Sequence, residues 1–142
     1  MITWNKYFME LAKLSAQRSK DPKTQVGACI IDPDTKKIVS IGYNGMPRGI
    51  VDNLEVWDDD KKHLYVVHAE ANAILNTTDD LNGKTLYVTM FPCNECAKLI
   101  IQKGIKKIVY LDDKFLYKES GKAALDIFRT CGVAVERYND NE

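Results

Sequence analysis

The sequence predicts an α/β fold, a three-layer helix-sheet-helix sandwich with a mixed five-stranded sheet. After residue 66, short segments rich in β-branched residues alternate with segments of helical periodicity, a pattern typical of βα units on parallel strands. Before residue 66, two β-rich segments flank a turn, and we expect them to form an antiparallel hairpin. The chain of 142 residues is long enough for one core, so residues 1–142 are predicted to form a single domain.

The part of the chain before residue 66 is expected to begin with a helix. Thr3 can cap this helix, and apolar side chains from Trp4 onward recur at helical spacing. The helix must end before Asp21, because a residue that precedes proline disfavours the α region. The segments expected next are a strand over residues 26–31, a turn over 32–35, a strand over 38–42 and a loop over 43–64.

The part after residue 66 is expected to alternate between helices and strands. Gly104 is expected to end one of the helices, since glycine readily adopts the left-handed conformation that often follows a helix. The expected helices cover residues 69–76, 95–103 and 120–130, and the expected strands cover residues 85–90, 105–111 and 133–138.

The charges of the chain balance. Lys plus Arg equals Asp plus Glu, at 20 each, so nothing indicates a general attraction to nucleic acid or to an anionic membrane. No apolar run approaches the length of a membrane span, and residues 1–10 lack the apolar stretch of a signal peptide. We therefore expect no nucleic-acid or membrane partner, whereas a small anionic substrate stays compatible with the sequence because a few local cations can bind it.

The cysteines indicate the compartment. Cys93 and Cys96 form a tight pair, whereas Cys29 and Cys131 stand alone in apolar surroundings and are expected to be small core residues. This distribution does not suit a disulfide framework and favours a metal site in a reducing compartment. We therefore expect a cytoplasmic protein.

Two short segments carry the residues expected to do chemistry. Residues 68–70 (His-Ala-Glu) begin one expected helix, and residues 92–96 (Pro-Cys-Asn-Glu-Cys) lead into another. A Cys-x-x-Cys at the start of a helix can turn both sulfurs toward one point, where the helix N-terminus and a zinc ion both favour the thiolate. His68 supplies a nitrogen, and three protein ligands leave the fourth tetrahedral position open, as in catalytic zinc sites. We therefore predict one zinc ion held by His68, Cys93 and Cys96.

Glu70 is the predicted catalytic residue. It lies two residues after His68, close enough to exchange protons with a water in the open position, whose pKa is about 7 in favourable zinc sites. Attack of that water on C4 of a cytosine ring gives a tetrahedral intermediate, and Glu70 can protonate N3 and later the leaving ammonia. The two segments match H-x-E…P-C-x-x-C, the signature of zinc-dependent deaminases. Glu95, inside the cysteine pair, is expected to be a solvated carboxylate that suits the helix dipole.

The Cys-x-x-Cys taken alone has other interpretations. It could be half of a closed structural zinc site or a redox pair. A closed site needs a fourth protein ligand, and the candidates are His63, Cys29 and Cys131. His63 stands in a charged loop and is expected to be exposed. A redox pair would leave His68 and Glu70 without a role, so the catalytic interpretation is favoured.

From about Trp4 to Tyr138, the chain resembles the deoxycytidylate (dCMP) deaminases of the zinc-dependent cytidine deaminase superfamily. The segments that carry the resemblance are residues 21–28 (Asp-Pro-Lys-Thr-Gln-Val-Gly-Ala), 42–47 (Gly-Tyr-Asn-Gly-Met-Pro), 68–74 (His-Ala-Glu-Ala-Asn-Ala-Ile) and 91–98 (Phe-Pro-Cys-Asn-Glu-Cys-Ala-Lys). The metal motifs identify the superfamily, and the Gly-Tyr-Asn-Gly stretch with Asn72 narrows the resemblance to the dCMP branch. The resemblance implies the mixed five-stranded sheet, the same three zinc ligands and Glu70 as the proton shuttle.

The resemblance also implies a substrate and its contacts. It implies hydrolytic deamination of dCMP to dUMP and ammonia, which supplies dUMP for dTMP synthesis. Asn44 would hydrogen-bond the sugar, the backbone of Ala69 would touch the cytosine edge, and Pro92 would shape the pocket. The resemblance further implies a homohexamer that is activated by dCTP and inhibited by dTTP, often with Mg²⁺. From the residues alone, Asn44 equally suits a tight turn, since Asn-Gly is a common turn pair.

The phosphate of such a substrate needs cations or backbone donors. Lys23 precedes the first expected strand, and Tyr117 and Lys118 follow the strand expected at residues 105–111. Ligands of open α/β sheets bind outside the carboxyl ends of the strands, which favours Tyr117 and Lys118. Arg48 could instead serve an effector phosphate. For any one of these lysines taken singly, a solvated surface position is favoured over a phosphate contact.

Three other functions stay open. The motifs do not indicate how many phosphates the substrate carries, so the chain could be a dCTP deaminase or a dual dCMP/dCTP deaminase. A nucleic-acid base deaminase would need a cationic, aromatic-lined channel for the strand, which the balanced charge does not favour. A catalytically silent zinc module would have no need for the carboxylate of Glu70.

Overall fold

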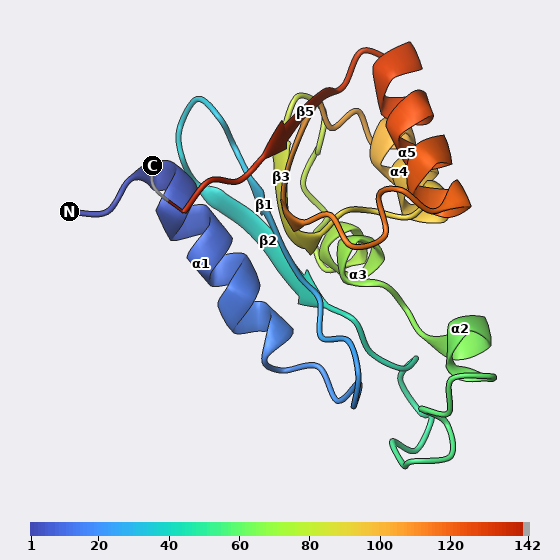
Figure 1. The fold of residues 1–142 in the computed structure, drawn as a ribbon. Coiled ribbons are helices and arrows are strands. Elements are labelled where there is room, and N and C mark those ends of the chain that lie inside the picture. The colour runs from blue at the N-terminus through green and yellow to red at the C-terminus, as the bar shows by residue number, and fades with distance from the viewer. Residues whose placement is uncertain (141–142) are drawn as a thin grey trace.

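A five-stranded sheet forms the centre of the computed structural model, which describes residues 1–140 (Figure 1). The strands are β1 (Gly27–Ile31), β2 (Ile38–Tyr43), β3 (Thr85–Met90), β4 (Lys107–Asp112) and β5 (Ala134–Arg137), in the order β2-β1-β3-β4-β5. β1 runs antiparallel to both β2 and β3, and β4 runs parallel to both β3 and β5. The predicted mixed sheet and the predicted opening hairpin are therefore confirmed.

Helices cover both faces of the sheet (Figure 1). They are α1 (Trp4–Ala16), α2 (Lys62–Tyr65), α3 (Ala69–Leu75), α4 (Asn94–Gln102) and α5 (Glu119–Thr130). α1 lies on one face, and α3, α4 and α5 lie on the other. The helix-sheet-helix sandwich is confirmed. Within residues 1–140, no helix has the length and apolar character needed to span a bilayer.

Two apolar clusters hold the layers together, and strand alternation separates them. Cys29, Tyr87 and Val109 are neighbours across three strands and face α1. The residues beside them in sequence face the opposite way: Ile30 and Leu86 pack in the cluster with α3, α4 and α5. Successive side chains of a strand point to opposite faces, so each strand contributes to both clusters. Complete burial of one such side chain stabilises the fold by roughly 1.5–3 kcal/mol.

The helix ends follow the expected local signals, except that α1 ends earlier than the proline requires. The Thr3 hydroxyl caps α1 by accepting a hydrogen bond from the Lys6 N–H at 3.1 Å. α1 ends at Ala16, well before the proline at position 22, because the following residues make tighter turns. Gly104 has a φ of +80° and ends α4, as predicted. The next strand then begins at Lys107, because Ile105 still belongs to the turn.

One expected core residue is not in the core. Cys131 was predicted to be a small buried residue, and this is wrong, because its side chain is exposed. It is the C-cap of α5, beyond the turns whose buried face carries Ala124 and Phe128. Cys29, by contrast, is fully buried in β1, as predicted.

Helix α3 lies close to the edge strand β2, and several specific contacts hold it there. The Ser40 hydroxyl donates to the Ala73 carbonyl at 2.6 Å. The side-chain amide of Asn72 donates to the Tyr43 carbonyl of β2 at 2.8 Å, and that of Asn76 donates to the Ile41 carbonyl at 3.0 Å. A Cβ on Gly42 would lie 2.5 Å from the Ala73 nitrogen, so only glycine permits this approach.

We predict that Gly42→Ala destabilises the protein by about 2 kcal/mol, because the added methyl forces α3 away from β2. Urea unfolding followed by circular dichroism measures the change. Gly45→Ala is the matched control, since a Cβ there meets nothing within 4 Å, and its free energy of unfolding should stay within about 0.5 kcal/mol of the parent. Equal unfolding midpoints for the two variants would contradict the prediction.

Candidate active site

The candidate site lies at one end of the sheet, where segments far apart in sequence meet. The carboxyl ends of β3 and β4 are side by side because these strands are parallel. β1 runs the other way, so its first residue, Gly27, lies at this same end, paired with the last residue of β2, Tyr43. This is the position at which open α/β sheets bind ligands.

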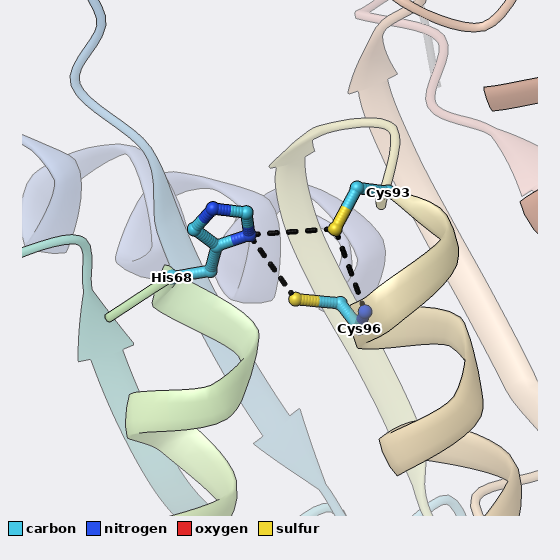
Figure 2. A group of neighbouring side chains, drawn as sticks. All are labelled: His68, Cys93 and Cys96. Atoms are coloured by element: carbon cyan, nitrogen blue, oxygen red, sulfur yellow. Dashed lines mark hydrogen bonds between the residues drawn. The ribbon is translucent and has the colours of Figure 1, made fainter. Parts of the chain in front are cut away.

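His68, Cys93 and Cys96 converge at this end of the sheet from two helix starts (Figure 2). His68 is the N-cap of α3 and Cys93 is the N-cap of α4. The His68 Nδ1 atom lies 3.4 Å from the Sγ atom of Cys93 and 3.4 Å from that of Cys96. All three ligand atoms lie within 4.8 Å of one another.

These distances and donor types fit a tetrahedral zinc ion. With bonds of about 2.3 Å to sulfur and about 2.0 Å to nitrogen, a tetrahedral zinc holds its sulfur and nitrogen ligands roughly 3.5 Å apart. The observed separations of 3.4 Å agree with that requirement. Among the described residues, this is the only group of three His, Cys, Asp or Glu side chains whose ligand atoms are close enough to hold a metal. Three ligands leave one coordination position for a water or substrate.

The site favours the thiolate form of Cys93. Its Sγ accepts a hydrogen bond from the backbone N–H of Cys96 at 3.4 Å, in the first turn of α4. A hydrogen bond from the Cys96 thiol, together with His68, lowers the pKa of Cys93 to about 4. The same hydrogen bond raises the pKa of Cys96, because Cys96 holds the shared proton. A preformed thiolate is the form of cysteine that binds metal.

Glu70 lies in the first turn of α3, in a buried position. Only 4% of the Glu70 surface is exposed. Burial raises the pKa of Glu70 to about 7, and the nearby His68 opposes this rise. A carboxyl group with a pKa near neutrality can both accept and donate protons at physiological pH.

A cavity of about 340 Å³ opens next to the ligands and Glu70. This volume lies in the range usual for sites that hold a small molecule. Its wall is formed by six regions of the chain: the segment before β1, the residue after β2, α2 with the residues around it, the start of α3, the end of β3, and the start of α5. The lining residues used below are Asp21, Thr24, Asn44, Lys62, His63, Ala69, Glu70, Pro92, Phe115, Lys118 and Ser120.

Asn44 is buried in this wall and makes several hydrogen bonds. Its Oδ1 accepts from the Val26 N–H at 2.8 Å, and its Nδ2 donates to the Thr24 carbonyl at 2.9 Å. Nδ2 also lies 3.4 Å from the Asp21 carboxylate. Both amide hydrogens therefore have partners, and the second lone pair of Oδ1 is the group that can still serve a ligand.

Comparison with known proteins identifies the family. Residues 2–112 match the family described as the cytidine and deoxycytidylate deaminase zinc-binding region. The chain belongs to this family. The matched range contains His68, Glu70, Cys93 and Cys96.

Individual relatives agree with this assignment. The deoxycytidylate deaminase of Mus musculus is 50% identical over 144 residues, which cover 96% of this chain and 80% of the relative. The probable deoxycytidylate deaminase of Drosophila melanogaster is also 50% identical, over 96% of this chain and 73% of its own length. The crystal structure of dCMP deaminase from the cyanophage S-TIM5, in complex with dCMP and dUMP, has a TM-score of 0.79 at 29% identity and covers 94% of this chain and 95% of that one.

The structure brings together some of the residues that the sequence singled out and separates others. Ala69, Asn44, Pro92 and Lys118 line the cavity together with Glu70, His68 and Cys93. Lys23 and Tyr117 are exposed and are not among the lining residues, and their assignment to the substrate stays a prediction.

Sequence reasoning missed Lys62 and Asp21, which also line the cavity. Asp21 stood in a segment that carried the family resemblance, which was a usable signal. Lys62 stood in a run of charged loop residues that gave no signal. His63 is exposed, as predicted, yet it too borders the cavity.

We predict that Cys93→Ser weakens zinc binding by roughly a hundredfold or more, since even the loss of a residue that only orients a ligand costs 10–100-fold. Zinc titration against a chromogenic chelator measures this affinity. Cys131→Ser is the matched control, because Cys131 is exposed and stands outside the ligand cluster. Parent-like zinc affinity in Cys93→Ser would remove Cys93 from the ligand set.

Proposed function

We propose that this protein deaminates dCMP to dUMP and ammonia by hydrolysis, with one zinc ion held by His68, Cys93 and Cys96. The observation that carries the proposal is the buried Glu70 beside three metal-binding side chains, at the wall of a cavity of about 340 Å³. Family membership and relatives named as deoxycytidylate deaminases support the choice of nucleotide. The similarity to a dCMP deaminase crystallised with dCMP and dUMP supports it further.

Glu70 moves the protons in the proposed reaction. When bound, a zinc ion lowers the pKa of a coordinated water to about 7, which makes that water a nucleophile at neutral pH. Glu70 accepts the proton of the attacking water and delivers it to N3 of the cytosine ring. It then takes the second proton from the new hydroxyl on C4 and passes it to the amino group, so that the C4–N bond breaks, ammonia leaves and a carbonyl remains at C4. The same carboxyl group serves both transfers, as acceptor in one and donor in the next.

The cavity wall supplies the proposed contacts to base, sugar and phosphate. Ala69 lies at the start of α3 next to His68, from which its backbone can meet the cytosine edge. Pro92 is buried directly before the ligand Cys93 and limits the width of the pocket. Asn44 offers the remaining lone pair of its Oδ1 to a sugar hydroxyl. Lys118, at the start of α5, is the proposed phosphate contact, with Tyr117 beside it and Lys23 farther out.

Regulation and assembly are proposed from the family resemblance. They comprise activation by dCTP, inhibition by dTTP, Mg²⁺ bound with the effector, and a homohexamer. Exposed large apolar side chains on β2 and α3, such as Ile41, Tyr43 and Leu75, support subunit contact, since oligomer interfaces bury such groups. A cytoplasmic location is supported by the ligand pair Cys93 and Cys96, which a reducing compartment keeps as thiols.

The proposed reaction is tested by ammonia release from purified, zinc-loaded protein, with dCMP and dCTP assayed in parallel. We expect turnover of dCMP that dTTP suppresses and dCTP at low concentration stimulates. A protein that turns over dCTP better than dCMP would be assigned to the alternative, dCTP deamination. No ammonia from either nucleotide, with one zinc ion per chain, would refute the proposal.

Glu70→Gln is predicted to lower kcat by about 10²–10⁴-fold while the zinc content stays at the parent level, because the amide cannot transfer protons. Glu95→Gln is the matched control. Glu95 lies between the two cysteine ligands, but it is exposed and pairs with Lys98, so its kcat should match the parent. A near-parental kcat for Glu70→Gln would show that another group moves the proton.

A further inference from the structure

The cavity wall contains a carboxylate that the proposed reaction does not use. Asp21 lines the cavity, and its side chain is only 4% exposed. Its Oδ1 accepts hydrogen bonds from the backbone N–H groups of Lys23 and Thr24 at 2.9 and 3.1 Å. A buried negative charge is expensive, and it is not expected in the wall of a site for an anionic substrate unless it has a partner or a purpose.

The partner of Asp21 is Lys62, which comes from α2 and also lines the cavity. The Lys62 Nζ atom lies 3.0 Å from Oδ2 and 3.2 Å from Oδ1 of Asp21. Lys62 also lies 3.7 Å from Asp59, but the Asp59 carboxylate is half exposed and pairs with Lys23 as well. The pair with Asp21 is therefore the one that is shielded from water and neutralises Lys62 inside the wall.

Because Lys62 is paired with Asp21, little positive charge remains in the cavity wall to attract a phosphate. Lys118 is a lining lysine too, and no carboxylate of residues 1–140 lies within ion-pair distance of it. A 5′-monophosphate carries about −1.5 to −2 charge at neutral pH, and every added phosphoryl group increases that charge. One unpaired lysine suits the smaller charge, whereas a triphosphate needs further cations.

We propose that Asp21 determines specificity in the proposed reaction by neutralising Lys62, and so favours a nucleoside monophosphate over the corresponding triphosphate. Asp21 acts through Lys62 and is not a catalytic residue. Specificity of this kind comes from withholding a favourable contact from the wrong ligand. The inference rests on the proposed function, because it concerns the phosphate of that substrate.

Asp21→Asn is the main test. Asn can still accept the backbone hydrogen bonds of Lys23 and Thr24 through its Oδ1, so the local turn is retained. Its neutral amide cannot form an ion pair with the Lys62 ammonium, whose positive charge is then no longer neutralised and can attract a phosphate. We expect the ratio of kcat/KM for dCMP to kcat/KM for dCTP to fall at least about tenfold, through a lower KM for dCTP with kcat little changed.

Asp34→Asn is the matched control, because it makes the same charge change in the turn between β1 and β2, at the opposite end of β1 from the cavity. Its ratio should stay within about twofold of the parent. Lys62→Met is the opposite test, since it leaves the Asp21 carboxylate unpaired in the wall, and the ratio should rise. If either Asp21→Asn or Lys62→Met folds with full zinc content and keeps the parental ratio, the proposal is wrong.

A binding measurement tests the role of Asp21 independently of the proposed reaction. Calorimetric titration of the zinc-loaded protein with dUMP and with dUTP measures the preference for monophosphate without turnover. Asp21→Asn should reduce that preference at least about tenfold, and Asp34→Asn should leave it unchanged. Absence of ammonia release from dCMP by the parent refutes the reaction, whereas an unchanged dUMP-to-dUTP affinity ratio in Asp21→Asn refutes the role of Asp21.

Discussion

The meeting of the first turns of α3 and α4 is the constraint on which the site depends. His68 belongs to one of these turns and the two cysteines belong to the other, with β3 between them in sequence. Their ligand atoms come within 4.8 Å only because α3 packs tightly on β2 and α4 begins directly after β3. Hydrogen bonds between Asn94 and Ser120 join the start of α4 to the start of α5 and hold the first turn of α4 in place.

The same packing sets the chemistry of Glu70. A carboxyl group in the first turn of a surface helix is normally solvated, and Glu95 in α4 is exposed in this way. Glu70 occupies the corresponding position in α3, but it faces inward and loses its contact with bulk water. Desolvation raises its pKa to about 7. The fold thus gives the first-turn glutamates of two helices different surroundings, since Glu95 is exposed and Glu70 is buried beside the cavity.

The long connection after β2 contributes to the cavity through a few fixed points. The Asn44 amide ties the end of β2 to the segment before β1, and Lys62 ties α2 to Asp21 in that same segment. The Trp57 indole, itself buried, donates to Asp52 within the loop. These contacts bring residues that are 18 to 41 positions apart to one side of the cavity. The charge that the cavity presents to a phosphate therefore depends on how the loop is attached.

The sequence by itself determined the layered fold, and it singled out Glu70 and the three side chains that the structure brings within metal-binding distance of one another. Period-two and helical patterns and the Cys-x-x-Cys spacing are local, so each segment carries its own signal. Only the tertiary structure decided that Lys62 and Lys118 border the cavity while Lys23 and Tyr117 do not, and that Cys131 is exposed. Asp21 and Lys62 are distant in sequence. Asp21 lies in an irregular segment and Lys62 lies in a helix of four residues, so neither segment has a periodic pattern that predicts the direction of its side chains. Their pairing depends on how α2 lies against the segment before β1.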